Sequence, residues 1–326
     1  MSNLSVNTIT DASGGSTASI NGLRPQASNM QPYNILINGG LDIWQRGTSI
    51  ALNNQADAYS ADRWAGYANG GVNVNYTQQA GSYTANGKNN SIRVQRDAGS
   101  SGRYYLYQMI ETSALNKCRG KTVTVSFVAK RGADLGATSV VFRIGTKSSE
   151  SGWDDSPVEY VDNTLSLSTS WQTYTYSFTL TSTSDAANGF FVAFVIEGVG
   201  GANVWYEVSQ LQMEIGSTAS PFAHENYGDT LRKCQRYYQP FRVAYETSLG
   251  GTGNINSPAT AFSVPMRASP TMTASDQNDG TTTCTLIAFG SNGSVATGYY
   301  SYQASLSVTA SGYTYRYLRG NAYAEL

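Results

Sequence analysis

The sequence has few charged residues, and neither sign dominates. Charged residues make up 13% of the 326 positions, about half of the 25% that is usual in globular proteins. Lysine plus arginine number 21 and aspartate plus glutamate number 22. Such a balance produces no strong field to attract nucleic acid or an anionic membrane surface, so we expect no nucleic-acid partner.

Long hydrophobic runs are also missing. The longest one, Phe190–Ile196, is far shorter than the roughly 20 apolar residues that a membrane-spanning helix needs. The chain opens without a charged segment followed by an apolar stretch, so we expect no cleavable signal peptide. The sequence therefore predicts no membrane insertion.

Cysteine and histidine are scarce. Cys118, Cys234 and Cys284 are widely separated, which favours neither a disulfide framework nor a zinc site. We expect the three cysteines to be small buried side chains in a protein that folds in a reducing compartment. His224 is the only histidine and lies in the polar segment PFAHENY. A linker role is favoured there over that of a catalytic base, because no nucleophile-elbow pattern accompanies it. No glycine-rich phosphate loop is present, so no cofactor is predicted.

Alternation of apolar and polar residues is the strongest local pattern. It runs through Thr122–Ala129 and Trp171–Leu180, and over shorter stretches at Val72–Tyr76 and Val204–Val208. Phe190–Ile196 is apolar throughout, which predicts a central strand buried on both faces. Helical periodicity is almost absent. The pattern predicts an all-β protein built on a jelly-roll β-sandwich of two sheets.

Four segments follow from these patterns: an N-terminal arm at 1–32, the jelly roll at 33–222, a short helical linker at 223–240 and a second, smaller C-terminal β domain at 241–326. In the linker, Asp229 or Thr230 is expected to cap the helix and Pro240 to end it. Further strands are expected around Thr260–Met266, Pro270–Thr273, Cys284–Phe289, Tyr299–Val308 and Tyr313–Leu318.

The first 32 residues contain no aromatic side chain and too little apolar surface to fold alone. Two interpretations remain open, a disordered tail and an arm that orders against a partner or a sister subunit. The arm is favoured because Val6, Ile9, Ile20 and Leu23 would otherwise be exposed to water.

Several stretches carry a resemblance. Ile37–Thr48 (INGGLDIWQRGT) and Ser60–Trp64 (SADRW) resemble the opening of a module common in bacteriophage tail, fibre and other virion-surface proteins. The resemblance continues through Tyr107–Glu111 and Gly120–Lys130, and Leu211–Phe222 is similar to the final strand of carbohydrate-binding jelly-roll modules. Parts of the same phage proteins also resemble Val6–Gly14, Tyr227–Tyr238 and Val264–Thr271.

The resemblance implies a bacteriophage virion structural protein, assembled in the host cytoplasm and located in the virion. Such proteins are usually homotrimers, and the arm residues Val6, Ile9, Ile20 and Leu23 would then attach it to other virion proteins. Two roles stay open. One is a short fibre or adhesin-like appendage that binds host-surface glycan, and the other is a capsid decoration, cement or tail-adaptor subunit without a ligand. Head or tail placement is not indicated.

Glycan contact needs flat aromatic faces beside short polar side chains. Trp153 stands next to Asp154 and Asp155 in a loop-like segment, where it has no evident core to fill. These three residues, and the C-terminal tyrosines Tyr299, Tyr300 and Tyr302, are the candidate carbohydrate or partner contacts.

The remaining tryptophans are expected to serve packing. Trp171 and Trp205 lie in alternating strands and are predicted to pack across strands. Trp44 and Trp64 are predicted to belong to the core, with Arg63 forming a fork to a carboxylate such as Asp62 or Glu111.

No enzymatic activity is predicted. Glycoside hydrolysis needs two carboxyl groups about 5–9.5 Å apart, and neighbouring Asp154 and Asp155 would point to opposite faces of an extended chain. A β-helix repeat is absent as well. Related jelly rolls often hold a structural calcium, for which Asn38, Asp42 and Leu211–Glu214 are the places to look, but no ligand spacing supports one.

Overall fold

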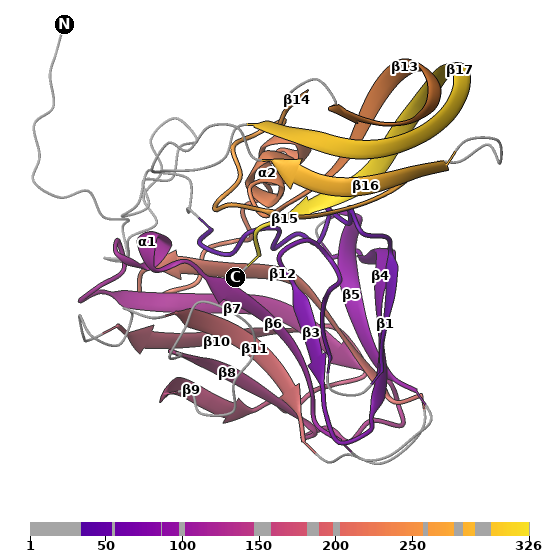
Figure 1. Ribbon diagram of the computed structural model, residues 1–326. Coiled ribbons are helices and arrows are strands. Elements are labelled where there is room, and N and C mark those ends of the chain that lie inside the picture. The colour runs from indigo at the N-terminus through magenta and orange to yellow at the C-terminus, as the bar shows by residue number, and fades with distance from the viewer. Residues whose placement is uncertain are drawn as a thin grey trace, which may run out of the picture.

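Two six-stranded antiparallel sheets packed face to face form the larger part of the molecule (Figure 1). The computed structural model describes residues 34–53, 56–85, 87–97, 102–146, 158–180, 189–197, 203–256, 260–276, 283–290 and 301–325. Sheet I has the order β1 (Ser49–Asn53), β4 (Asn73–Tyr83), β5 (Asn89–Arg96), β12 (Trp205–Ile215), β7 (Thr122–Arg131) and β10 (Gln172–Thr179). Sheet II has the order β2 (Ala56–Tyr59), β3 (Ala65–Ala68), β6 (Tyr104–Ile110), β11 (Phe190–Ile196), β8 (Val140–Thr146) and β9 (Val158–Thr164).

The chain passes repeatedly between the two sheets. Between β6 and β12, each strand lies in the opposite sheet from the strand before it. The one exception is the step from β8 to β9, which form a hairpin within sheet II. Crossing of this kind, with every pair antiparallel, gives a jelly-roll sandwich. The predicted all-β fold class is confirmed.

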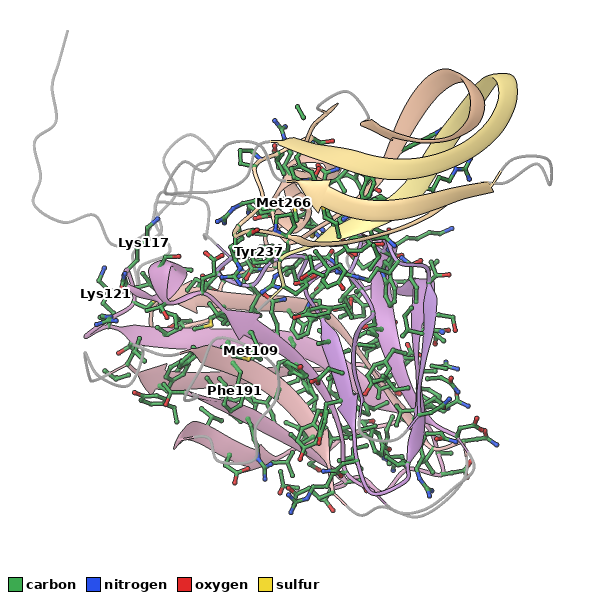
Figure 2. The ribbon with its side chains drawn as sticks, in the orientation of Figure 1. Met109, Lys117, Lys121, Phe191, Tyr237 and Met266 are labelled. Carbon is green, nitrogen blue, oxygen red and sulfur yellow. The ribbon has the colours of Figure 1, made fainter. Side chains whose placement is uncertain are left out.

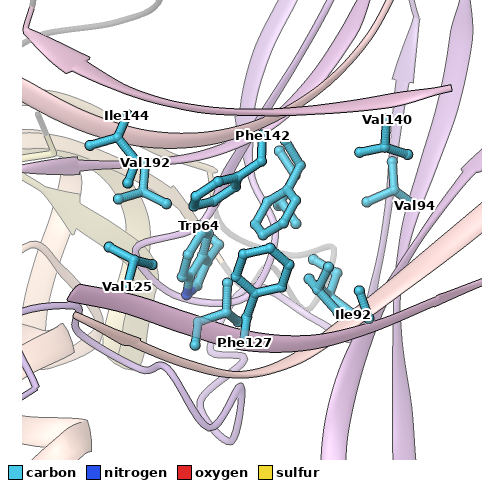
Figure 3. Packing of buried hydrophobic residues seen from close by; sticks show 14 of the residues in the cluster. Trp64, Ile92, Val94, Val125, Phe127, Val140, Phe142, Ile144 and Val192 are labelled. Atoms are coloured by element: carbon cyan, nitrogen blue, oxygen red, sulfur yellow. The ribbon is translucent and has the colours of Figure 1, made fainter. Parts of the chain in front are cut away.

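The core lies between the sheets and is rich in aromatic rings (Figure 3). Phe127 of β7 lies 4.7 Å from Phe142 of β8 and 4.9 Å from Phe194 of β11, measured between ring centroids. Trp64 is fully buried in the same cluster, and half-buried Trp44 packs against it. Both tryptophans therefore serve packing, as predicted.

Strand β11 occupies the centre of sheet II, between β6 and β8. All seven of its residues are buried. Phe190, Val192, Phe194 and Ile196 belong to the core between the sheets. Phe191, Ala193 and Val195 belong to a second cluster on the outer face of sheet II. The continuous apolar run thus marks a strand buried on both faces, which confirms the prediction.

Two helices are described, α1 (Thr112–Leu115) and α2 (Tyr227–Gln235). The predicted linker helix exists, but both of its expected ends are wrong. Asn226 caps α2 because its side-chain oxygen accepts a hydrogen bond from the Gly228 amide at 2.9 Å. The helix ends well before Pro240, since Tyr237 already pairs with the last strand, its carbonyl accepting from the Ala324 amide.

The C-terminal part is a sheet organised around one long strand. Its strands are β13 (Tyr238–Asn256), β14 (Thr260–Ala261), β15 (Thr271–Asp276), β16 (Thr283–Gly290) and β17 (Ser301–Tyr323). Every other strand pairs with β17. Figure 1 shows β13 and β17 as a curled ribbon beside the sandwich. The division of the chain into four segments remains a prediction.

Three details of this sheet differ from expectation. The two strands expected at Tyr299–Val308 and Tyr313–Leu318 are one strand within the described residues, because β13 and β17 pair in continuous register. The strand expected to reach Met266 stops at Ala261. There Pro265 offers no amide for a ladder, and Phe262 and Met266 turn into a small core instead. No alternation predicted β13.

Candidate functional site

Most of the sequence-predicted contact residues lie outside the described part of the chain. These are Trp153, Asp154, Asp155, Tyr299 and Tyr300, together with the arm residues Val6, Ile9, Ile20 and Leu23. Tyr302 lies near the start of β17, opposite Thr260 of β14. The predicted contact site therefore stays a prediction.

A different set of side chains gathers on the outer face of sheet I. On β12, Tyr206 and Val208 are buried in the core between the sheets, so the alternating positions Trp205 and Glu207 take the outer face. Lys130 of β7 pairs with Glu207, as does Arg93 of β5 from the other side. The strand pairing thus brings aromatic and charged groups into one row.

Cations and indole rings alternate along this row. The Arg93 guanidinium carbon lies 4.0 Å from the centroid of the Trp205 ring. The Lys130 ammonium lies 5.7 Å from Trp205 and 4.8 Å from Trp171, which directly precedes β10. Such cation–π contacts hold each positive charge over an aromatic face. We name these four side chains and Glu207 the aromatic–cation ladder.

Glu207 lies beneath the ladder and is fully buried. Arg93 donates to it from Nε at 2.9 Å and from Nη2 at 2.6 Å, and the Lys130 ammonium lies 3.5 Å away. The hydroxyls of Ser82 and Ser91 also donate to it. Burial raises the pKa of Glu207, but the hydrogen bonds from Ser82 and Arg93 and the charge of Lys130 outweigh burial and lower it. The ionised carboxylate therefore fixes both cations.

The far end of the β4–β5 hairpin reaches across sheet I to the ladder. The register of β4 against β5 is interrupted after Gln79, where Gly81 takes a left-handed conformation with φ of +61°. The Trp171 indole donates to the Ser82 carbonyl at 3.3 Å. Its ring meets the Tyr83 ring edge-on at 5.3 Å between centroids. The hairpin thereby holds Trp171 in place over the sheet.

Trp171 and Trp205 are both half-buried, so part of each indole is open to solvent. Their predicted cross-strand packing is confirmed in the contacts with Lys130 and Arg93. Neither residue was among the sequence-predicted ligand contacts. The available signal was the alternation along β12. Because neighbouring residues of a strand point to opposite faces, Trp205 points away from the core that buries Tyr206.

A second charged cluster joins the sandwich to the C-terminal sheet. Arg63, which is 2% exposed, has a left-handed φ of +73°. Its Nη1 lies 2.5 Å from a carboxylate oxygen of Glu325, its Nη2 donates to the Met109 carbonyl at 2.7 Å, and its guanidinium lies 3.7 Å from the Tyr237 ring centroid. Arg63 thus pairs with a carboxylate, as expected, but the partner is Glu325 and neither of the two suggested residues, Asp62 and Glu111.

The reason for the error is distance along the chain, since Glu325 is 262 residues away from Arg63. Glu111 instead accepts from the Tyr237 hydroxyl at 2.8 Å. Arg46 pairs with Glu325 at 2.7 Å and lies 3.7 Å from the nearest Asp62 oxygen. Residues of the INGGLDIWQRGT and SADRW segments therefore contact Glu325, near the C-terminal end that Figure 1 places where the two parts of the molecule meet.

Asp62 is a second buried carboxylate of this joint. Burial raises its pKa to about 6, although hydrogen bonds from Gln45 and the charge of Arg46 act in the opposite direction. Gln45 donates both to Asp62 and to the Tyr238 carbonyl on the C-terminal side. These contacts link the opening motif to the start of β13.

A cavity of about 100 Å³ lies next to the joint, lined in part by Arg63, Glu111, Lys233 and Arg236. Each cation there has a carboxylate nearby. Lys233 pairs with Glu225, and Arg236 lies 3.6 Å from Glu111. Because each of these cations already lies near a carboxylate, an anion that entered the cavity would meet no uncompensated positive charge.

The oxygen atoms considered for calcium take part in protein hydrogen bonds. Asn38 bridges backbone groups at Asp42, Ile43 and Asp62. Asp42 accepts from Asn90, and Glu214 accepts from Ser220. Among the residues that the structure describes, no three histidine, cysteine, aspartate or glutamate side chains gather as metal ligands would. His224 packs edge-on against Phe222.

The comparisons with known proteins concern the fold. No protein-family model matches the sequence, and a search of curated proteins found no match. Solved structures of carbohydrate-binding modules resemble the sandwich. A family 4 module is 19% identical and covers 48% of this chain and 97% of its own, with a TM-score of 0.30. The CBM22-1 xylan-binding domain of Paenibacillus barcinonensis Xyn10C is 13% identical and covers 52% and 95%, with a TM-score of 0.33.

A third structure is the family 11 module of the cellulosomal cellulase Lic26A-Cel5E of Clostridium thermocellum. It is 16% identical, covers 53% of this chain and 96% of its own, and has a TM-score of 0.31. Likeness at these identities and TM-scores carries no conclusion about the ligand or the role of this chain. In the described ranges, no helix has the length and apolar character needed to cross a membrane.

Proposed function

We propose that this protein binds a glycan through the aromatic–cation ladder of sheet I. The observation that carries the proposal is the pair of half-buried indoles, Trp171 and Trp205, held in one row by Lys130 and Arg93. A sugar ring offers C–H faces that stack on an indole and hydroxyls that bond to nearby polar groups. The ladder supplies both kinds of contact, stacking and hydrogen bonding, on one face of a sheet and without a conformational change.

The proposal extends to the setting of the protein. On the resemblance of its motifs, we propose a bacteriophage virion structural protein, a short fibre or adhesin-like appendage on the virion surface, assembled as a homotrimer and anchored by residues 1–32. The glycan would belong to the host surface. We propose no catalysis, because the one buried carboxylate of the ladder, Glu207, is already ionised and bonded to two cations.

The test compares variants on a glycan array and by affinity electrophoresis. Trp171→Ala and Trp205→Ala remove the open indole surfaces, and the double variant is expected to lose all glycan retention. Tyr227→Ala is the matched control, because Tyr227 is a 61% exposed aromatic on α2, away from sheet I. A wild-type chain that binds no glycan, or a double variant that binds as well as wild type, would refute the proposal.

A second candidate is a capsid decoration, cement or tail-adaptor subunit. Strand β13 favours it, since among the described strands this 19-residue strand pairs only with β17. The other edge is a row of backbone donors and acceptors that another subunit could pair with. Cryo-electron microscopy of intact particles separates the two candidates. Density that projects with sheet I free supports the appendage, whereas density lying flat between capsomers or rings supports the cement.

A further inference from the structure

We infer that the glycan recognised by the ladder is acidic, a polysaccharide carrying carboxylate or sulfate groups. This inference rests on the proposed function and adds the chemical class of the ligand. It comes from the charges that accompany the indoles rather than from the indoles themselves.

The exposed charge at the ladder is positive. Arg93 and Lys130 keep 28% and 20% of their side chains exposed, whereas Glu207 is completely covered. Lys88, on the hairpin that reaches the ladder, is exposed and packs against Gly81. The exposed carboxylate in the turn after β7 is that of Asp134. At the indoles themselves the partly exposed charges are those of Arg93 and Lys130, while the carboxylate that compensates them lies beneath.

The two cations keep donors for a ligand. Arg93 bonds Glu207 through Nε and Nη2, which leaves Nη1 for an external acceptor. Lys130 has three ammonium donors and makes one long contact with Glu207, at 3.5 Å. A carboxylate on a sugar ring stacked over Trp205 would find both cations nearby, since Arg93 lies 4.0 Å and Lys130 5.7 Å from the centroid of that indole. Charge-assisted bonds of this kind are stronger than those a neutral hydroxyl could make.

A neutral glycan would use the ladder poorly. The indole faces are already shared with the cations, so a sugar stacking there must remain next to a positive charge. Hydroxyl groups gain little from this, whereas an anionic group gains a direct partner without displacing Glu207. The arrangement is also preorganised, because Glu207 holds both cations before any ligand arrives.

The experiment measures binding of the full chain to matched polymers. Polygalacturonate, alginate and hyaluronate are each compared with the same polymer after methyl esterification of its carboxyl groups, by isothermal titration calorimetry in 50 mM and 200 mM salt. We expect at least one acidic polymer to bind about 10-fold more tightly than its ester, with the difference shrinking in high salt.

The variant that tests the mechanism is Lys130→Met, which keeps the aliphatic stem and removes the charge. It should weaken binding of the acidic polymer about 3- to 10-fold more than it weakens binding of the ester. Arg232→Gln is the control, since Arg232 is 68% exposed on α2 and its loss changes the net charge equally. Arg93 is left in place because its removal would leave Glu207 buried without its main partner.

The outcomes separate the two proposals. Binding of an ester as tightly as its acid overturns the acidic class and leaves glycan binding intact. Acid-selective binding that Lys130→Met does not weaken, or that Arg232→Gln weakens equally, also overturns it. Competition by polyglutamate as strong as by the acidic glycan would show attraction to charge alone and overturn it too. Failure of every polymer, acidic and esterified, together with no retention on the array, refutes the proposed function itself.

Discussion

The two sheets of the sandwich have the same number of strands, but their outer faces differ in polarity. The outer face of sheet II carries a buried apolar cluster, in which Tyr105, Tyr107, Phe191 and Val195 lie with Tyr237 of the C-terminal side. Figure 2 shows Phe191 and Met109 on this sheet and Tyr237 between it and the C-terminal part. The outer face of sheet I instead bears the ladder and exposed threonines such as Thr173 and Thr175 of β10.

The difference shows that the outer faces of two equivalent sheets can lie in different environments within one fold. Sheet II holds the rest of the chain, because its buried outer cluster and the Arg63–Glu325 pair receive the segment after α2. Sheet I keeps a polar outer face on which charged groups stay partly exposed. The same alternation of side chains thus gives a polar outer face on sheet I and a buried apolar cluster on the outer face of sheet II, because the two sheets differ in composition.

The largest effect is expected at the buried outer face. Phe191→Ala should lower the free energy of unfolding by about 3–5 kcal/mol, because it empties a fully buried site on the central strand β11. Thr175→Ala, at an exposed outer position of sheet I, should change it by less than about 0.5 kcal/mol. Chemical denaturation measures both. Equal costs for the two variants would contradict the contrast between the faces.

The next effect is expected at the joint. Glu325→Gln leaves Arg63 buried without its carboxylate and should cost about 2–3 kcal/mol. The damage should be local, so limited proteolysis should cut the chain near α2 more quickly than in wild type. Glu225→Gln, which breaks the more exposed pair with Lys233, is the control and should cost less than about 1 kcal/mol. Unchanged proteolysis would mean that the pair does not hold the two parts together.

A smaller effect is expected where the backbone supports the ladder. A Cβ added at Gly132 would lie 2.7 Å from the Trp205 indole nitrogen, so Gly132→Ala must displace the ring. We expect a loss of about 1–2 kcal/mol in stability and a clear drop in glycan affinity, although no aromatic residue is removed. Calorimetry and affinity electrophoresis on the same sample measure the two effects. Full affinity in a stable variant would show that the position of Trp205 does not matter.

The smallest effect compares two buried carboxylates by pH. The pKa of Asp62 is raised to about 6, so the folded state holds its proton more tightly, and stability from this group falls as pH rises from about 4 to 6. The pKa of Glu207 is lowered, so its contribution is present above pH 4.5 and is lost as pH falls through the lower folded value.

The corresponding variants should therefore act in opposite directions. Asp62→Asn should remove a decline in stability between pH 4 and 6, and Glu207→Gln should remove a decline below pH 4.5. Thermal unfolding at half-unit intervals of pH measures both profiles. A wild-type profile that both variants leave unaltered would show that neither carboxylate titrates with folding.

Much of the fold could be predicted because it depends on local pattern. The alternation at Thr122–Ala129 and Trp171–Leu180 became β7 and β10, and the apolar run became the central strand β11. Periodicity fails where no alternation exists, as in the glycine-rich β13, whose pairing with β17 supplies what its own sequence lacks. Around Pro265 the error was the reverse. The apolar spacing there predicted a strand, but the apolar residues belong to a small core.

The sequence by itself determined the all-β class, the helix before β13 and the buried character of Trp64, because backbone geometry and burial follow from neighbouring residues. Only the tertiary structure decided which charges meet. Arg63 found Glu325 at the far end of the chain, and Lys130, Trp205 and Arg93 came from three strands to form one row. Strand order is set by the packing of the whole sandwich, so contacts across strands are invisible to any local pattern.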